Sequence, residues 1–500
     1  MSLESSNCNI SQVVKTLIPD NLTAESYLRE LCYKGLKDRY ETKISNVITD
    51  RLETELKVIK NKELIEHFLI IWEIVNWAKN NSIAVCPGSG SIASSVVAYT
   101  LQITDVDPIR FELFFEFFLN IETKVRPRFY FEVSNEDLDK IKNHILELYN
   151  FYYRLDSNEL YIPELSLNIS KLNSLSILKE AMILVEKNQN SSNLKEIRNN
   201  MILRNFLGLK EKSFENINCS IKNTEEINFV IRNMLNLDDI SVYDIFQKGL
   251  TLGIYPGGTK MYNEFLKKLM PTKLDDIVAL IALYNPSYLK NGLIDDFIKR
   301  KNGTQKFDYL HSSLESILED TYGIYLYREQ IIKTAVVLAG FTSNEANQFC
   351  KDLVKGNKIE RLEARRKFIE SSIKNGLNKK LSEKILASMI RFKIYRDIIP
   401  IKSHYVAQIL MAYRSAFMKA YYPAEFLTAY LNLETKEIYK DSMYCSSDPN
   451  NKFTYNVTAL LNYCFVDVKN ECRVLGVEFN IPKKYDFESI FQTDGKKIWC

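Results

Sequence analysis

Apolar positions recur with the 3.6-residue period of an amphipathic helix through most of this 500-residue chain. The period is first clear over residues 24–80, as in ELIEHFLIIWEIVNWAKN, and from about 171 to 432 one helical pattern follows another. Shorter segments interrupt it, and their composition predicts strands at Ile83–Val85, Phe129–Val133 and Leu160–Ile169. We therefore expect an α+β fold that is predominantly helical.

Composition excludes several classes of protein. The most apolar run, Phe111–Leu119, contains two glutamates and is far shorter than the roughly 20 residues of a membrane helix. The opening MSLESSNCNIS lacks the basic and then apolar pattern of a signal peptide, so we expect a cytoplasmic protein without membrane contact. The nine cysteines contain no C-x-x-C pair and the four histidines are widely spaced, which argues against a zinc site or a disulfide framework.

Positive charge is concentrated in one segment. The net charge is only +3, but Lys351–His404 holds fifteen Lys and Arg against six Asp and Glu, a local excess of +9. The rest of the chain is therefore mildly acidic. Such a contrast is typical of a surface that faces phosphate groups, although a solvated helix face gives the same pattern.

A turn rich in Gly and Ser carries the first candidate chemistry. Gly88, Ser89, Gly90 and Ser91 follow a predicted strand and precede a helix expected over Ile92–Leu101. Backbone N–H groups in such a turn can bind phosphate oxygens. A nucleotidyltransferase palm adds a strand with carboxylates at positions i and i+2, which share one face and hold two Mg²⁺ ions. Here those positions hold Arg128 and Tyr130.

Long collinear segments then resemble the α subunit of bacterial DNA polymerase III, the C-family replicative polymerase. The segments that carry the resemblance are PGSGSIASSVVAYTLQITDVDPIRFELFFEFFLN (87–120), DDIVALIALYNP (275–286), GLIDDFIKRKNG (292–303), LEDTYGIYLYREQI (318–331), VVLAGFTSNEAN (336–347), KSHYVAQILMAYRSAFMKAYYPAEFLTAYL (402–431) and ECRVLGVEF (471–479). The resemblance implies a small palm remnant followed by a large helical fingers domain.

The family's metal-binding aspartates are not carried over. The resemblance places its first two at Arg128 and Tyr130 and its third at Asn168. Glu132 is the remaining acid on the strand, and we expect it to form an ion pair with Arg128. We therefore expect no catalytic residue, no metal site and no cofactor, with Mg²⁺ needed only if activity survives.

Only 40 residues separate Arg128 from Asn168, so we expect the family's thumb to be largely absent. We also expect the chain to lack the family's N-terminal phosphoesterase-like domain and most of its C-terminal region. The predicted domains are a tail and helical part of the palm (1–80), a degenerate palm core (81–170), helical fingers (171–435), a linker (436–458) and the start of a truncated C-terminal extension (459–500).

In the fingers, the resemblance marks cations and a short K-S-H motif. Lys355, Lys402, Ser403 and His404, with the turn at 88–91, become candidates for phosphate or nucleotide binding. Arg365, Arg366 and Lys393 become candidates for DNA binding. The alternative for the K-S-H motif is that it caps and packs the helix that follows it.

Three functions remain open. The first is a catalytically inactive polymerase homologue that binds DNA or nucleotide through its fingers. The second is a protein-interaction scaffold without DNA affinity, docked on a replication or mobile-element protein. The third is an active polymerase with an unusual metal site. We favour the first.

Overall fold

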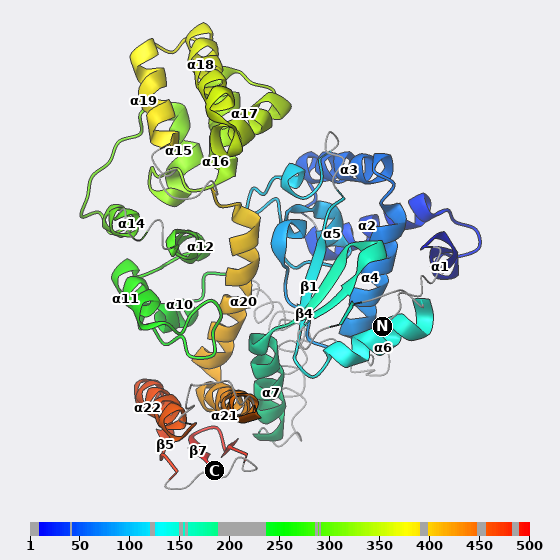
Figure 1. Cartoon of the computed structure of the whole chain (residues 1–500), viewed down its shortest axis with the longest axis vertical. Coiled ribbons are helices and arrows are strands. Elements are labelled where there is room, and N and C mark those ends of the chain that lie inside the picture. Colours follow the sequence, from blue (N-terminus) through cyan, green and yellow to red (C-terminus); the bar gives the residue numbers. More distant parts are fainter. Residues whose placement is uncertain are drawn as a thin grey trace.

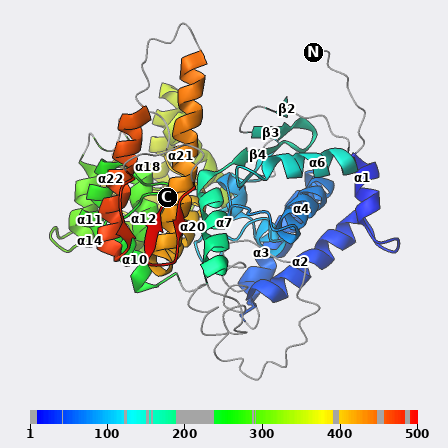
Figure 2. The same ribbon diagram turned by 90° about the horizontal axis from the view of Figure 1, so that it is seen from below.

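The computed structural model describes residues 10–40, 43–120, 126–149, 154–155, 159–188, 237–285, 289, 292–390, 399–447, 457–482 and 490–500. Within these ranges the fold is α+β and predominantly helical, as predicted. Two bodies lie on either side of a central helix, α20 (Lys402–Tyr421), and Figures 1 and 2 show them from perpendicular directions.

The first body contains helices and one sheet, and it spans the residues over which the sequence predicts the palm. Its described N-terminal part contains α1 (Ile10–Leu17), α2 (Ala24–Tyr40), α3 (Asn46–Asn61) and α4 (Ile65–Asn80). A 3₁₀ helix, η1 (Gly90–Ser94), and the short α5 (Val96–Thr100) follow the Gly/Ser turn. α2 crosses α5 at Gly35, where an added Cβ atom would lie 1.9 Å from the Thr100 carbonyl oxygen. Only glycine permits this close crossing.

A four-stranded sheet completes this body. Its order is β1-β4-β3-β2, with β1 and β4 parallel and β3 antiparallel to both of its neighbours. The strands are β1 (Phe129–Val133), β2 (Arg154–Leu155), β3 (Glu159–Ile162) and β4 (Leu167–Lys171), and α6 (Leu138–Tyr149) lies between β1 and β2. Burial alternates along β1, β3 and β4, so one face packs into the core and the other carries the candidate site.

The second body is built from helices alone in its described part. Beside α20 it contains α7 (Asn173–Asn188), α10 (Ile240–Gln247), α11 (Lys260–Leu269), α12 (Leu274–Leu283), α14 (Leu293–Lys301) and α15 (Glu315–Leu318). At one end of the molecule lie α16 (Arg328–Ala339), α17 (Ser343–Lys355), α18 (Lys358–Lys374) and α19 (Lys379–Ile390). We call α17, α18 and α19 the tip helices.

A small C-terminal unit lies at the opposite end (Figure 1). It contains α21 (Pro423–Ser447), α22 (Val457–Leu475) and a three-stranded sheet of β5 (Glu478–Phe479), β6 (Gln492–Thr493) and β7 (Lys497–Trp499). None of the helices in the described ranges is both long enough and apolar enough to cross a membrane.

The structure differs from the predicted elements in three places. Ile83–Val85 forms one isolated bridge, from Val85 to Val133, instead of a strand. The predicted strand Leu160–Ile169 is two strands separated by η3 (Pro163–Leu165), because Pro163 ends the first strand. Residues 436–447, expected to begin a linker, continue α21, and 448–456 lie outside the described residues.

A buried carboxylate joins the two bodies. Asp105 accepts from Arg39 of α2 and from Arg414 of α20, each at 2.8 Å, and Lys79 of α4 lies 3.6 Å away. Burial raises the pKa of Asp105, but the charges of Lys79, Arg414 and Arg39 outweigh that effect and hold the pKa well below its usual range. Asp105 therefore remains ionised and ties three helices together.

Asp105→Asn is expected to lower the free energy of unfolding by about 3–5 kcal/mol at neutral pH, because three cations lose their shared counter-charge. The folded pKa lies below the unfolded value of about 3.9, so the carboxylate stabilises the fold above that value and loses this effect as pH falls toward the folded pKa. Urea unfolding measured at pH values from neutral down to about 3 should show that the difference in free energy of unfolding between wild type and Asp105→Asn becomes smaller as pH falls.

The matched control is Asp107→Asn. Asp107 accepts from the Tyr40 hydroxyl at 2.8 Å and from the Ile109 N–H at 2.9 Å, so its loss should cost only about 1 kcal/mol. Equal losses for the two variants at neutral pH would contradict a linking role for Asp105.

Candidate functional site

The Gly/Ser turn is held tightly against its surroundings. The Cys86 N–H donates to the Glu132 carbonyl oxygen at 2.9 Å, which joins the turn to β1. The Thr104 hydroxyl donates to the Pro87 carbonyl oxygen at 2.8 Å. A Cβ atom at Gly88 would lie 2.6 Å from the Thr104 hydroxyl, so glycine is required there. Ser89, Gly90 and Ser91 are partly exposed.

The helix behind the turn offers little to a phosphate. The expected helix over Ile92–Leu101 is instead η1 followed by the five-residue α5. The buried Glu55 carboxylate accepts from the Val97 N–H at 3.1 Å, and the Ser95 hydroxyl accepts from the Ala98 N–H at 3.1 Å. Two of the N–H groups at the start of α5 are therefore already occupied from within the protein.

The sheet brings the degenerate metal positions together. Arg128 immediately precedes β1, Tyr130 and Glu132 follow it at alternate positions on the strand, and Tyr130 pairs in register with Asn168 of β4. These four side chains therefore share one face of the sheet. A Cβ atom at Gly90 would lie 3.8 Å from Tyr130 Cδ2, so the tyrosine ring stands between the turn and the strand.

The structure does not pair Arg128 with Glu132, so the prediction of an ion pair between them is wrong. The Arg128 side chain is exposed and hydrogen-bonds to Tyr130, whereas Glu132 hydrogen-bonds to the buried Cys86 thiol. Burial raises the pKa of Glu132, and the Cys86 hydrogen bond opposes that rise only in part. Asn168 donates its amide N–H to Glu159 of β3.

This arrangement does not fit a pair of divalent cations. Glu132 is the one carboxylate on β1, and its raised pKa reflects surroundings that disfavour charge. No group of three or more His, Cys, Asp or Glu side chains within the described residues could hold a metal ion. Mg²⁺ prefers near-octahedral oxygen ligands, of which carboxylates are the usual protein source; Arg128 has no side-chain oxygen, and Tyr130 has a phenol in place of a carboxylate.

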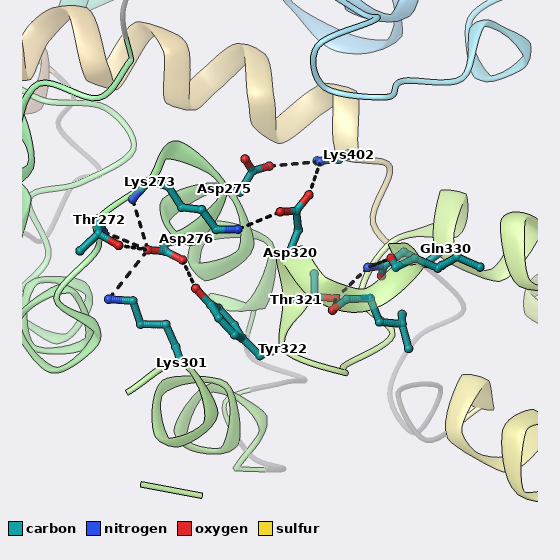
Figure 3. Close-up of polar contacts among 12 residues, drawn as sticks. Thr272, Lys273, Asp275, Asp276, Lys301, Asp320, Thr321, Tyr322, Gln330 and Lys402 are labelled. Atoms are coloured by element: carbon teal, nitrogen blue, oxygen red, sulfur yellow. Dashed lines mark hydrogen bonds and ion pairs between the residues drawn. The ribbon is translucent and has the colours of Figure 1, made fainter. Parts of the chain in front are cut away.

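The candidate phosphate ligand Lys402 is buried inside the protein, in the network that Figure 3 shows. Its ammonium lies 3.1 Å from Asp275 of α12 and 3.6 Å from Asp320. Burial lowers the pKa of Lys402, but the charges of Asp275 and Asp320 more than offset this and raise it above its usual value. The two carboxylates therefore neutralise Lys402 and leave it unsuited to binding phosphate.

Further hydrogen bonds hold those carboxylates in place (Figure 3). Lys273 donates to Asp320 at 2.8 Å. The neighbouring Asp276 accepts from the Tyr322 hydroxyl at 2.7 Å and from the Thr272 N–H at 2.9 Å. Lys402 thus anchors the start of α20 to the start of α12 and to the segment around Asp320.

The rest of the K-S-H motif also supports the packing interpretation. The buried Glu329 carboxylate of α16 accepts from the Lys402 N–H at 2.9 Å and caps α20 from outside. Ser403 is fully buried. His404 reaches solvent, and burial together with Arg328 lowers its pKa. Lys402 and Ser403 thus begin and pack α20, whereas His404 is exposed.

The tip helices keep several candidate cations at the surface. Lys355 is exposed at the end of α17. Arg366 is exposed on α18 and lies 3.8 Å from Glu370, whereas Arg365 is only partly exposed. Lys393 lies outside the described residues. The structure therefore separates exposed cations, at the tip, from the buried cation at the start of α20.

Two family models match the chain, one over most of the first body and one over part of the second. Residues 26–155 match the bacterial DNA polymerase III alpha NTPase domain, and residues 212–376 match the bacterial DNA polymerase III alpha subunit finger domain. The chain belongs to the bacterial DNA polymerase III alpha-subunit family. The resemblance read from the sequence is confirmed.

Curated relatives of this polymerase III alpha family align along most of the chain. DNA polymerase III subunit alpha of Aquifex aeolicus is 29% identical over 84% of this chain and 45% of that protein. The Buchnera aphidicola subunit is 30% identical over 82% and 43%, and the Escherichia coli subunit 27% identical over 83% and 44%. The chain thus spans less than half the length of these relatives.

Several residues that organise this polymerase III alpha homologue were not among the site residues predicted from the sequence, although Asp320 and Glu329 lie in a segment (318–331) that carries the resemblance. Glu55, Asp320 and Glu329 are buried or partly buried acids that meet their partners across 40 or more residues. A sequence signal existed only for Glu329, which lies in an apolar segment where an unpaired acid is costly.

Glu329→Gln is expected to stabilise the fold at alkaline pH. Burial raises the pKa of Glu329 to about 7, against hydrogen bonds from backbone N–H groups. Since the folded pKa exceeds the unfolded value of about 4.3, wild-type stability falls as pH rises from that value through about 7. Glutamine still accepts from the Lys402 N–H but does not ionise, so urea unfolding should show a gain of about 1–3 kcal/mol at pH 8.

The stability that Glu329→Gln gains at pH 8 should become smaller toward pH 5. Glu345→Gln provides the control, because Glu345 is an exposed capping residue whose pKa is lowered by the Thr342 N–H and by Lys367. Its loss should lower stability at pH 8. A destabilised Glu329→Gln protein at pH 8 would contradict the account of Glu329.

Proposed function

We propose that this chain is a catalytically inactive member of the polymerase III alpha family that binds DNA through its fingers, in a role associated with DNA replication. The observation that carries the loss of catalysis is the shared sheet face of Arg128, Tyr130, Glu132 and Asn168. Glu132, whose pKa is raised, is the one carboxylate on β1, and Glu159 of β3 on the same face accepts from Asn168, so these two stand in place of the set of acids needed to position two cations.

The positive charge of Arg128 on this face also cannot take the place of two metal ions in phosphoryl transfer. Phosphoryl transfer depends mainly on positioning and on neutralising negative charge with metal ions. Arg128 is exposed and supplies one positive charge, but it cannot bridge attacking and leaving oxygens as a pair of metal ions does. The ring of Tyr130 also lies beside Gly90, where the turn would approach a nucleotide.

The proposed DNA surface is the exposed positive charge of the tip helices. Lys355 on α17 and Lys379, Lys380 and Lys384 on α19 are exposed. Arg366 adds an exposed cation on α18, and the partly exposed Arg365 adds less. Phosphate contacts of this kind give affinity that does not depend on base sequence and weakens with salt. Lys402 is excluded from this surface because Asp275 and Asp320 neutralise it.

A protein-interaction scaffold is the second candidate, and one cleft favours it. A cleft of about 450 Å³ separates the palm-side residues Glu112 and Phe114 from Val336 and Val337 of α16. Val337 is 47% exposed, so the cleft presents apolar surface of the kind that protein partners use. A replication or mobile-element protein is the partner class proposed for it.

DNA binding is tested by fluorescence anisotropy of a labelled primer–template duplex across a salt series. We expect affinity in or below the micromolar range at low salt, with log Kd rising linearly with log salt. Replacing Lys355, Lys379 and Lys380 together with Gln should weaken binding about tenfold or more and flatten the salt slope.

Two controls isolate the tip surface. Replacing the exposed Lys34, Lys37 and Lys57 of α2 and α3 with Gln removes the same charge elsewhere and should change affinity little. Lys402→Gln should lower stability without changing the affinity of the folded protein. No binding at low salt would reject DNA binding and leave the scaffold.

Catalytic loss is tested by primer extension with Mg²⁺ or Mn²⁺, where wild type should give no product. The combined variant Arg128→Asp, Tyr130→Asp and Asn168→Asp restores three carboxylates to one sheet face and should gain Mn²⁺ affinity, measured by electron paramagnetic resonance. Extension by wild type that Glu132→Gln abolishes would instead establish an active enzyme with an unusual metal site.

A further inference from the structure

Helix α18 is apolar on its outer side as well as on its inner side. Its inner side buries Ala364 and Phe368 against the fingers core. Its outer side carries Ile359, Leu362 and Ile373, whose exposed fractions are 68%, 56% and 41%. Large apolar side chains at this exposure, repeated along one helix, indicate a surface that packs against another protein.

These outer residues follow the heptad spacing of a coiled coil. Ile359, Leu362, Arg366, Ile369 and Ile373 are separated alternately by three and four residues, which assigns them to positions a, d, a, d and a. Ile369 is partly buried and the other four are exposed. We call these five residues the α18 seam.

Charges beside the α18 seam complement a second copy of themselves. Lys358 and Arg365 occupy the g positions, and Glu363 and Glu370 occupy the e positions. In a parallel pair of helices, each g residue faces the e residue five positions later on the partner. Lys358 would then face Glu363 of the second copy, and Arg365 would face Glu370.

The antiparallel arrangement fails on the same charges. There g faces g and e faces e, so Lys358 and Arg365 would meet cations and the two glutamates would meet each other. From this asymmetry we infer that α18 docks in parallel on α18 of a second copy of this chain, around a two-fold axis that runs along the helices.

Arg366 limits the strength of this dimer. It stands at the central a position, where a charged side chain costs stability but sets the register. Its long side chain can reach solvent, and its guanidinium already lies 3.8 Å from Glu370 of its own helix. The helix has only 17 residues, so we expect a reversible dimer with a Kd in the micromolar range.

This inference goes beyond the proposed DNA binding and shares only Arg365 and Arg366 with it. In the dimer, Arg365 and Arg366 lie at the contact between copies, while Lys355 and the lysines of α19 remain available to DNA. The two proposals can therefore be rejected independently. Self-association is measured in the absence of DNA, and the DNA-binding variant at Lys355, Lys379 and Lys380 leaves α18 unchanged.

Sedimentation equilibrium of the full chain tests the dimer from about 1 to 200 μM. Wild type should show a concentration-dependent monomer–dimer equilibrium. Leu362→Glu should raise the dimer Kd at least about thirtyfold, and Arg366→Leu should lower it about tenfold, because a leucine at position a packs where the arginine cannot. Val466→Glu is the control, since Val466 is 47% exposed on α22 at the other end of the molecule.

Charge exchange tests the parallel pairing directly. Lys358→Glu with Arg365→Glu makes both flanks acidic, and Glu363→Lys with Glu370→Lys makes both basic, so neither protein should self-associate. Their equimolar mixture should form a heterodimer, because every facing pair is again of opposite charge. Circular dichroism checks that each variant is folded.

Two results would overturn the inference. One is a wild-type chain that remains monomeric at the highest concentration while Arg366→Leu is also monomeric. The other is a dimer that neither Leu362→Glu nor the charge exchange affects, since such a dimer would use another surface. Loss of DNA affinity with the dimer intact would bear on the proposed function alone.

Discussion

The carboxylate of Asp105 is the constraint on which the arrangement of this protein depends. Arg39, Lys79 and Arg414 come from three helices in both bodies, and a shared counter-charge lets them approach one another in a largely buried space. α20 runs between the bodies and is buried on all sides over much of its length. Its position, and with it the distance from the palm sheet to the fingers, follows from this junction.

A second set of charges fixes the start of the same helix. Asp275 and Asp320 enclose Lys402, and Glu329 caps the backbone beside it. Residues that resemble phosphate ligands by motif therefore serve here to anchor α20. Because the Lys402 ammonium is buried between two carboxylates, the proposed function assigns the positive charge for nucleic acid to the exposed tip helices.

The palm sheet brings together the positions that hold the family's metal ligands, but other residues occupy them. β1 and β4 still lie side by side in parallel, so positions 128, 130 and 168 meet as a metal site would require. Those positions hold the cation of Arg128, the phenol of Tyr130 and the amide of Asn168, and the Tyr130 ring lies close to Gly90. The same backbone positions thus carry a polar face in which one cation, one phenol and one amide replace carboxylates.

The sequence by itself determined the helical fold class, the family and the identity of the residues at the metal positions, because periodicity and motifs are local properties of the chain. Only the tertiary structure decided which charges are available. Lys402 and Lys355 both lie in the basic segment, yet one is buried between carboxylates and the other is exposed. The partners Asp275 and Asp320 lie more than 80 residues from Lys402 in the chain, and Asp105 lies about 309 residues from Arg414. Burial and pairing across such separations depend on packing, which no local pattern encodes.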